Sequence, residues 1–240
     1  MARPRVLITG FGPFPGFANN PSAWLVETLA ERQRAPEIEL RARVLPTEWE
    51  KVALVPRLFE ALQPHVMIHF GVSENASAFA IERLAYNRAE RECDACGAMP
   101  KDRNIRVGGP QRFDTLFPAA ALAAHLRRSG IAARTSRSAG AYLCNFLYYH
   151  SLGWAQAQRN APTVIFVHIP PWTRKRGALS REALLHGGAE TLRFVLSCAN
   201  GEKPLKRPGR PPISRSEAPR GDASWGDAHR GEAGSSAKGA

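Results

Sequence analysis

The sequence has few of the features that mark secreted or membrane proteins. Its 240 residues include only four cysteines, Cys93, Cys96, Cys144 and Cys198, which are too few for a disulfide scaffold at this length. No apolar run approaches the roughly 20 residues that a membrane-spanning helix needs. No apolar signal region follows Met1 either. We therefore expect a soluble, cytoplasmic protein with no membrane partner.

Acidic residues are scarce relative to basic ones. Lys and Arg number 33 against 21 Asp and Glu, which gives a formal net charge of +12. This balance makes a non-catalytic nucleic-acid-binding protein a rival hypothesis. The basic residues are spread along the chain, however, and no basic helix or aromatic-interleaved stripe accompanies them. The sequence therefore predicts no specific nucleic-acid partner.

Complete motifs for phosphate or metal binding are missing as well. The stretch Gly10–Pro15 begins like a dinucleotide fingerprint, but proline stands at the third glycine position and no Gly-Lys-Ser/Thr follows. Cys93 and Cys96 form a lone CxxC without a second pair of ligands. A coincidence in a surface loop explains that pair more simply than metal or redox use. We expect neither a cofactor nor a metal.

What the sequence does contain is an alternation of strands and helices. Apolar or alternating runs predict strands at 5–9, 38–44, 65–70, 131–136 and 163–167. Helical spacing and caps predict helices at 21–31, 48–62, 115–129 and 180–200. This order predicts an α/β fold, a single domain over residues 1–200 with an open, twisted, mostly parallel sheet flanked by helices on both faces. Residues 201–240, rich in Gly, Pro and Arg, are predicted to form a disordered tail.

The stretch Ser138–Asn145 is where we expect the chemistry to be centred. Small residues and Gly140 lead into an apolar run that reads as a helix start, which would place Cys144 in or just before the first turn. There the helix dipole and the unpaired N–H groups favour a thiolate, the nucleophilic form of cysteine. The alternative is an ordinary cysteine buried in the core.

Two further residues could act with such a thiolate. His168 follows the apolar run Thr163–Val167, at the carboxyl end of a central strand, where open α/β sheets bind ligands. Glu82 lies in an apolar segment, where a carboxylate needs a partner, either the adjacent Arg83 or a distant histidine. With Cys144, these residues form a candidate triad of nucleophile, general base and orienting carboxylate.

Four stretches of the sequence resemble the type I pyroglutamyl peptidases, cysteine peptidases that remove N-terminal pyroglutamate. The matching stretches are Thr9–Gly16 followed by Asn20–Ser22, then Glu82–Asn87, Ser138–Asn145 and Phe166–Pro170. They occur in the family's order and spacing over about residues 5–200. The resemblance implies a cofactor-free peptidase that acts on peptides with N-terminal pyroglutamate, and it is compatible with a homo-oligomer such as a family-like tetramer.

The same resemblance implies roles for individual residues. The catalytic group would be Glu82, Cys144 and His168, the ring-binding group Phe11, Phe14 and Leu143, and the oxyanion-binding residue Arg91. A pyroglutamyl ring is a neutral lactam, so aromatic faces and backbone hydrogen bonds suit it better than an acidic side chain. For the two phenylalanines, the alternative is that both simply fill the core.

Two loops depart from the family pattern. Residues Gly71–Ala76 stand where the family typically carries a Gln-Ala-Gly-Gly-like loop that contributes to substrate binding. Residues Arg91–Gly97 replace an Ile-Pro-Asp-Asn-like sequence. Both departures leave the candidate triad intact. They motivate an alternative, a related cysteine hydrolase that removes a different N-terminal group.

Overall fold

A computed structural model of the chain describes residues 3–33, 36–74, 76–172, 179–199 and 201. Residues 1–204 form one compact unit, and the predicted tail lies outside the described residues except for Gly201. Within the described part, the strands are β1 (Arg5–Phe11), β2 (Glu39–Leu45), β3 (Val66–Val72), β4 (Phe79–Glu82), β5 (Leu84–Tyr86), β6 (Arg112–Asp114), β7 (Ala133–Ser136) and β8 (Thr163–Ile169). The helices are α1 (Pro21–Arg32), α2 (Trp49–Ala53), α3 (Val55–Leu62), α4 (Ala119–Arg128), α5 (Leu143–Gln156) and α6 (Arg181–Ala199).

The main sheet has the strand order β2-β1-β3-β8-β4-β7. Its first four strands are mutually parallel, whereas β4 runs antiparallel to β8 and parallel to β7. The mostly parallel sheet predicted from the sequence is therefore confirmed. Strands β5 and β6 form a separate antiparallel pair.

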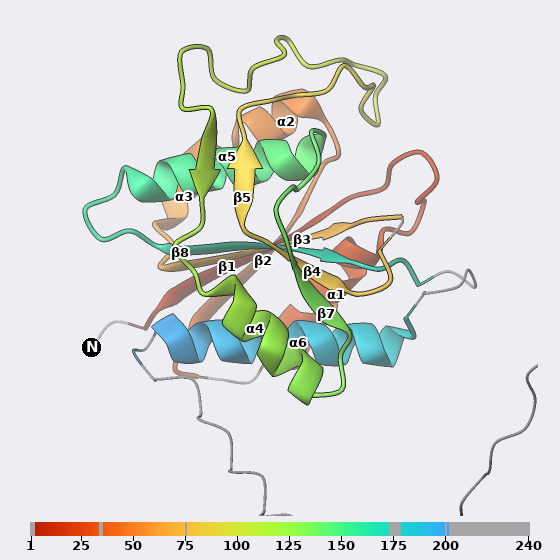
Figure 1. Cartoon of the computed structure of the whole chain (residues 1–240), viewed down its shortest axis with the longest axis vertical. Coiled ribbons are helices and arrows are strands. Elements are labelled where there is room, and N and C mark those ends of the chain that lie inside the picture. The colour runs from red at the N-terminus through yellow and green to blue at the C-terminus, as the bar shows by residue number, and fades with distance from the viewer. Residues whose placement is uncertain (1–2, 34–35, 75, 173–178, 200, 202–240) are drawn as a thin grey trace, which may run out of the picture. The chain divides into compact units, whose positions relative to one another are not determined.

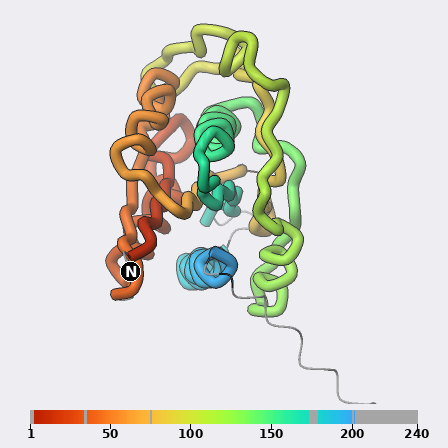
Figure 2. Tube along the Cα trace, turned by 90° about the vertical axis from the view of Figure 1, so that its left-hand side faces the viewer, coloured from red at the N-terminus to blue at the C-terminus, as the bar shows by residue number. Residues whose placement is uncertain are grey.

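Helices cover both faces of the sheet, as predicted. Figure 1 shows α2, α3 and α5 on one side and α4 and α6 on the other, and in Figure 2 α5 and α6 lie on opposite sides of the strands. Each side has its own apolar core. One core joins the sheet to α1, α4 and α6, and the other joins it to α2, α3 and α5. No helix among the described residues is long and apolar enough to cross a membrane.

Prolines and caps decide where the helices begin. The side chain of Asn20 accepts a hydrogen bond from the N–H of Ser22, so α1 begins where the sequence predicted. The single helix expected over 48–62 is wrong, because Pro56 has no N–H to continue the helical ladder and α3 starts anew after Leu54. The helix expected from Thr115 begins only after Pro118, for the same reason.

Strand alternation determines which residues share the α5 side of the sheet. Leu7, Met67 and Phe166 pack into the α5 core, whereas Ile8, Ile68 and Val167 pack into the opposite one. Because successive side chains point to opposite faces, positions two and four residues further along each strand also face α5. Phe11, Gly71 and His168 occupy such positions at the carboxyl ends of β1, β3 and β8, where the candidate site lies.

Candidate active site

Cys144 is the second residue of α5, as the sequence predicted. The turn before it contains Gly140, whose φ of 80° lies in the left-handed region that favours glycine. The next residue, Asn145, is fully buried and fastens the helix start to the strand segment after Glu82. Its side chain accepts a hydrogen bond from the N–H of Tyr86 and donates to the carbonyls of Tyr86 and Arg88. The turn at Gly140 and the hydrogen bonds of Asn145 thus fix the position of the Cys144 thiol.

Close packing against strand β3 also fixes the position of the Cys144 sulfur. A Cβ atom at Gly71, on β3, would lie 2.8 Å from Cys144 Sγ and 2.8 Å from the ring of Phe166. Only a residue without a side chain therefore fits beneath the sulfur at this position. This glycine is the first residue of the loop that departs from the family pattern, and its role is steric.

His168 and Glu82 meet on the same side of the sheet, although they are 86 positions apart in the chain. The antiparallel pairing of β4 with β8 places Ala80 opposite His168 and Glu82 opposite Phe166. The Nδ1 of His168 lies 2.8 Å from Glu82 Oε1, and the glutamate is only 2% exposed. This ion pair decides between the two partners considered for Glu82, because Arg83 is exposed and, as the next residue along the chain, points away.

Charge around His168 favours its protonated form. Burial on its own would lower the pKa of this histidine, but the charge and hydrogen bond of Cys144 and those of Glu82 outweigh it. Together they raise the pKa of His168 to about 10. The opposite case lies nearby in β3, where burial lowers the pKa of His69 to about 3 and Thr9 shares a hydrogen bond with its Nδ1. His168 is therefore the histidine whose surroundings suit an imidazolium paired with a thiolate.

An aromatic wall stands on one side of the thiol. Phe11 is buried at the end of β1, and its N–H donates to Ser22 Oγ at the start of α1. The carbonyl of Gly12 accepts hydrogen bonds from the side chains of Asn20 and Thr47. These bonds tie the loop after β1 to both neighbouring segments and fix the ring of Phe11. Buried donors and acceptors satisfied in this way rigidify a site.

Further along the same loop, Phe14 is half-buried and its ring stacks on Phe17 with centroids 4.9 Å apart. Opposite the loop, Tyr142 and Leu143 contribute the start of α5 to the wall. The hydroxyl of Tyr142 donates to the carbonyl of Cys93. Burial first, and then the charges of Glu92 and Asp94, raise the pKa of Tyr142 to about 12, so its hydroxyl stays protonated.

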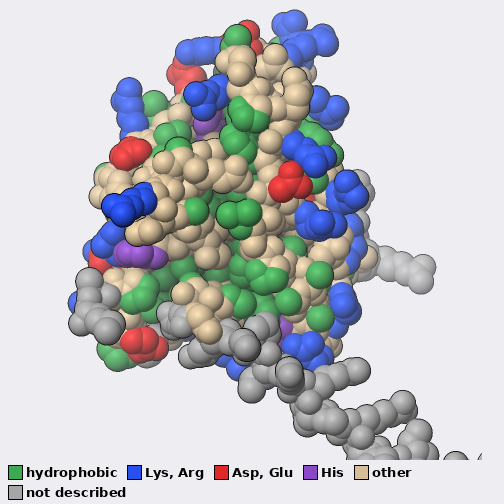
Figure 3. Space-filling view, turned by 60° about the vertical axis from the view of Figure 1, so that its left-hand side comes forward, with side chains coloured by type: hydrophobic (Ala, Val, Ile, Leu, Met, Phe, Trp, Pro, Cys, Tyr) green, Lys and Arg blue, Asp and Glu red, His purple; other side chains and the backbone are tan. Residues whose placement is uncertain are grey.

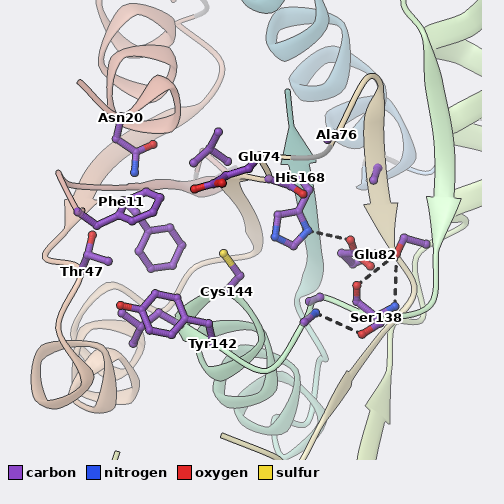
Figure 4. Close-up of a pocket in the computed structure, with 18 of the residues that line it drawn as sticks. Phe11, Asn20, Thr47, Glu74, Ala76, Glu82, Ser138, Tyr142, Cys144 and His168 are labelled. Atoms are coloured by element: carbon purple, nitrogen blue, oxygen red, sulfur yellow. Dashed lines mark hydrogen bonds and ion pairs between the residues drawn. The ribbon is translucent and has the colours of Figure 1, made fainter. Parts of the chain in front are cut away.

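A cavity of about 360 Å³ joins these parts. Its lining includes the triad, both predicted phenylalanines and Leu143. Figure 4 shows Phe11 and Thr47 on one side of Cys144, with His168, Glu82 and Ser138 on the other. A volume near the lower end of the roughly 300–1,000 Å³ usual for small-molecule sites suits one ring and the start of a chain. The structure thus brings together every predicted site residue except Arg91.

Arg91 is exposed and is not among the residues that line the cavity. The residue before it, Glu90, donates its N–H to the carbonyl of Ala141, so the loop does contact the segment leading to Cys144. Its assigned role at the oxyanion stays a prediction. Asp94, three residues on, is buried and anchors this loop by accepting the N–H groups of Trp49, Cys96 and Ala98.

Sequence reasoning missed several residues of the cavity. Asn20 lies in a stretch matched to the family and Glu74 in the departing loop Gly71–Ala76, but neither of them, nor Thr47 or Arg134, was assigned a role in the site. Two signals pointed to Thr47: it follows a proline at the carboxyl end of β2, and the stretch Val44–Thr47 also fits the family. Cys93 and Cys96 are free, exposed cysteines in the loop outside the cavity.

The chain has clear relatives among known proteins. Residues 4–176 match the profile of the family described as pyroglutamyl peptidase. Pyroglutamyl-peptidase 1 of Rattus norvegicus is 30% identical over 207 residues, covering 84% of this chain and 97% of the rat protein. Among solved structures, pyrrolidone carboxyl peptidase from Thermococcus litoralis superposes with a TM-score of 0.75 at 26% identity, covering 85% of this chain and 99% of that one. Pyroglutamyl peptidase I of Bacillus amyloliquefaciens gives 0.73 at 27% identity, covering 85% and 100%.

Proposed function

This chain belongs to the pyroglutamyl peptidase family, and from that premise we propose that it is a cysteine peptidase that removes pyroglutamate from the N-terminus of peptides. The observation that carries the proposal is that Cys144, His168 and Glu82 lie together in the lining of one cavity, and that Phe11 and Phe14 line the same cavity. A nucleophile, a base and an orienting carboxylate adjoin a pocket that suits a flat, neutral ring.

The reaction begins with an imidazolium at His168 and a thiolate at Cys144. The sulfur attacks the carbonyl carbon of the pyroglutamyl residue and forms a tetrahedral oxyanion. His168 then gives its proton to the leaving nitrogen as the C–N bond breaks, which leaves a thioester on the sulfur. The now neutral imidazole takes a proton from water, and the resulting hydroxide releases pyroglutamate and restores the thiolate. Glu82 keeps Nδ1 protonated throughout, so that Nε2 exchanges the proton.

The oxyanion needs donors that are already in place. The first turn of α5 supplies backbone N–H groups near the sulfur, and no side chain caps this helix. The helix dipole adds a partial positive charge at the same position. We assign the oxyanion to these N–H groups, with Arg91 as the additional donor that the family resemblance implies.

The ring of the substrate lies between Phe11 and Phe14 on one side and Leu143 on the other. The lactam has no free amine and no charge, so burying it against aromatic faces costs little. Its N–H and C=O each require one partner, and the polar side chains of Asn20 and Thr47 line the same end of the cavity. A pocket of this kind rejects a substrate whose N-terminus is a charged amine.

One observation favours the alternative of a different N-terminal group. Glu74, in the loop that departs from the family pattern, lines the cavity with a carboxylate that a cationic amine would match. The two hypotheses differ in which fluorogenic amide is cleaved fastest, the pyroglutamyl, prolyl or glutaminyl compound. We expect kcat/KM for the pyroglutamyl amide to exceed the others by at least about 100-fold, since stranded charge in such a site costs several kcal/mol. A faster prolyl or glutaminyl amide would support the alternative.

The basic charge of the chain offers weaker grounds for a nucleic-acid-binding function. On the face drawn in Figure 3, the Lys and Arg side chains lie mainly around the rim, and hydrophobic and uncharged atoms occupy the middle of the face. Dispersed charge of this kind gives sequence-blind binding that weakens steeply with salt. A salt-titrated binding assay with duplex DNA and with RNA distinguishes such background attraction from a specific site.

A further inference from the structure

A cationic side chain stands at the end of the cavity away from the aromatic wall. Arg134 lies on the edge strand β7 and lines the cavity together with Ser136 and Ser138. Strand register explains its position. Ala80 pairs with His168 on one side and with Arg134 on the other, so these residues form one row across three neighbouring strands on the same face.

Distances along that row follow from strand geometry. Neighbouring strands lie about 4.8 Å apart, so the backbones of His168 and Arg134 are separated by about 10 Å. Between them stands only the methyl group of Ala80, which leaves the space above it to the cavity. One residue of extended chain spans about 3.3–3.6 Å. A long arginine side chain on β7 therefore reaches the region where the first or second residue after pyroglutamate would lie in a bound peptide.

The guanidinium of Arg134 has no partner of its own. Within the described part of the chain it forms neither an ion pair nor a hydrogen bond. By contrast, Arg41 and Arg112, which are also exposed on strands, are neutralised by neighbours on their own strands, Glu39 and Asp114. An unpaired cation that lines a cavity beside the reacting groups is free to bind an anion from the substrate.

The direction of the bound peptide follows from the site. With the pyroglutamyl ring against Phe11 and the scissile carbonyl at Cys144, the rest of the peptide leaves toward the opposite side of the sulfur. Figure 4 shows that Glu82 and Ser138 lie on that side. Among the other charged residues of the lining, Glu82 is paired with His168, whereas Glu74 is acidic and would repel an anionic peptide. Arg134 is the cation that can offset this repulsion.

We propose that Arg134 is a specificity-determining residue of a leaving-group subsite, where it favours peptides that carry a carboxylate within the first two residues after pyroglutamate. The inference rests on the proposed pyroglutamyl peptidase function and adds its preferred substrate class. The carboxylate comes from one of two sources, an acidic side chain or the free C-terminus of a very short peptide. The chemistry of recognition is the same for both.

Matched pairs of peptides test this preference. One pair is pyroglutamyl-aspartyl-alaninamide against pyroglutamyl-asparaginyl-alaninamide, and the other is pyroglutamyl-alanine against pyroglutamyl-alaninamide. The readout is the ratio of kcat/KM within each pair. For the wild type we expect the acidic member to lead by about three- to tenfold in at least one pair, as for a partly exposed charge pair. Raising the salt to about 1 M should reduce that ratio, since screening weakens exposed pairs.

Three variants test whether Arg134 is responsible for the preference for acidic peptides. Arg134→Gln should abolish or reverse the ratio, because the acidic lining then acts unopposed, and Arg134→Lys should retain part of it. The control is Arg137→Gln, which removes an exposed arginine of the same segment that does not line the cavity. Its ratio should match the wild type.

Each adverse outcome has one meaning. Equal rates within both pairs for the wild type overturn the inference and leave the peptidase function standing. An equal loss of preference in Arg137→Gln and Arg134→Gln also overturns it, since the general positive field of the protein would then be responsible. Absence of cleavage for every pyroglutamyl peptide overturns the proposed function and the inference together.

Discussion

Replacing Glu82 by glutamine removes the charge that orients His168 while keeping the size of the side chain. The carboxylate is 2% exposed, and its Oε1 lies 2.8 Å from His168 Nδ1. A hydrogen bond between charged groups contributes about 1.5–3 kcal/mol. An amide can also hold the neutral ring in the wrong tautomer, which adds to the loss. We expect a total of about 3–5 kcal/mol in the barrier, or a fall in kcat of about a hundred- to ten-thousand-fold.

The assay is steady-state cleavage of a pyroglutamyl fluorogenic amide, with active enzyme normalised by the folded fraction. KM should change less than about threefold, because Phe11 and Phe14 hold the ring and neither contacts Glu82. The melting temperature should fall as well, since removing one partner of a buried ion pair leaves the other without its counter-charge; normalising by the folded fraction separates this loss of stability from the loss in rate. Glu90→Gln, which removes an exposed carboxylate outside the cavity, is the matched control. A Glu82→Gln variant that melts much earlier yet keeps its kcat would refute the reasoning.

Three other changes probe the same site. Gly71→Ala places a methyl group 2.8 Å from Cys144 Sγ, so we expect near-complete loss of activity and a destabilisation of about 1–3 kcal/mol in urea unfolding; an active, stable variant would contradict this packing. Asn145→Ala leaves Tyr86 and its neighbours without buried partners and should lower stability by about 2–4 kcal/mol, with kcat falling as the helix start loosens; unchanged thermal unfolding would count against it. Cys144→Ala removes the largest influence that raises the pKa of His168 to about 10, so the NMR titration midpoint of that ring should move downward. In the wild type, stabilisation from the charged ring is fully present below about pH 6.5 and is lost as the pH rises through about 10; identical titrations in the two proteins would exclude the thiolate as the cause.

Local chemistry made much of the fold predictable. Asn20 followed by Pro21 signals a helix start through its side chain and fixed φ, and the structure begins α1 there. The break at Leu54 was also readable, because Pro56 cannot sit inside a regular helix. It was missed because the apolar spacing runs on unchanged across the break. Periodicity reports which face is buried and is insensitive to a change of helix axis.

The reversed direction of β4 was beyond local reasoning. An apolar run looks the same whichever way the strand runs, and β4 pairs with β8, which lies far away in sequence. That pairing brings Glu82 to His168, and the pairing of β4 with β7 brings Arg134 to the cavity. The triad could be named from chemical requirements and family resemblance. Arg134 could not, because its role depends on a strand register that only the assembled sheet defines.

The central claim, that Cys144 attacks the pyroglutamyl carbonyl, is tested most directly by trapping the acyl-enzyme. A pyroglutamyl ester is mixed with the enzyme, the reaction is quenched in acid within milliseconds, and the digested protein is analysed by mass spectrometry. The account predicts one pyroglutamyl group on the peptide that contains Cys144, and none in Cys144→Ala, which should be inactive while remaining folded. Cys198→Ala should behave like the wild type. An adduct on another residue, or cleavage by Cys144→Ala at the wild-type rate, would contradict the account.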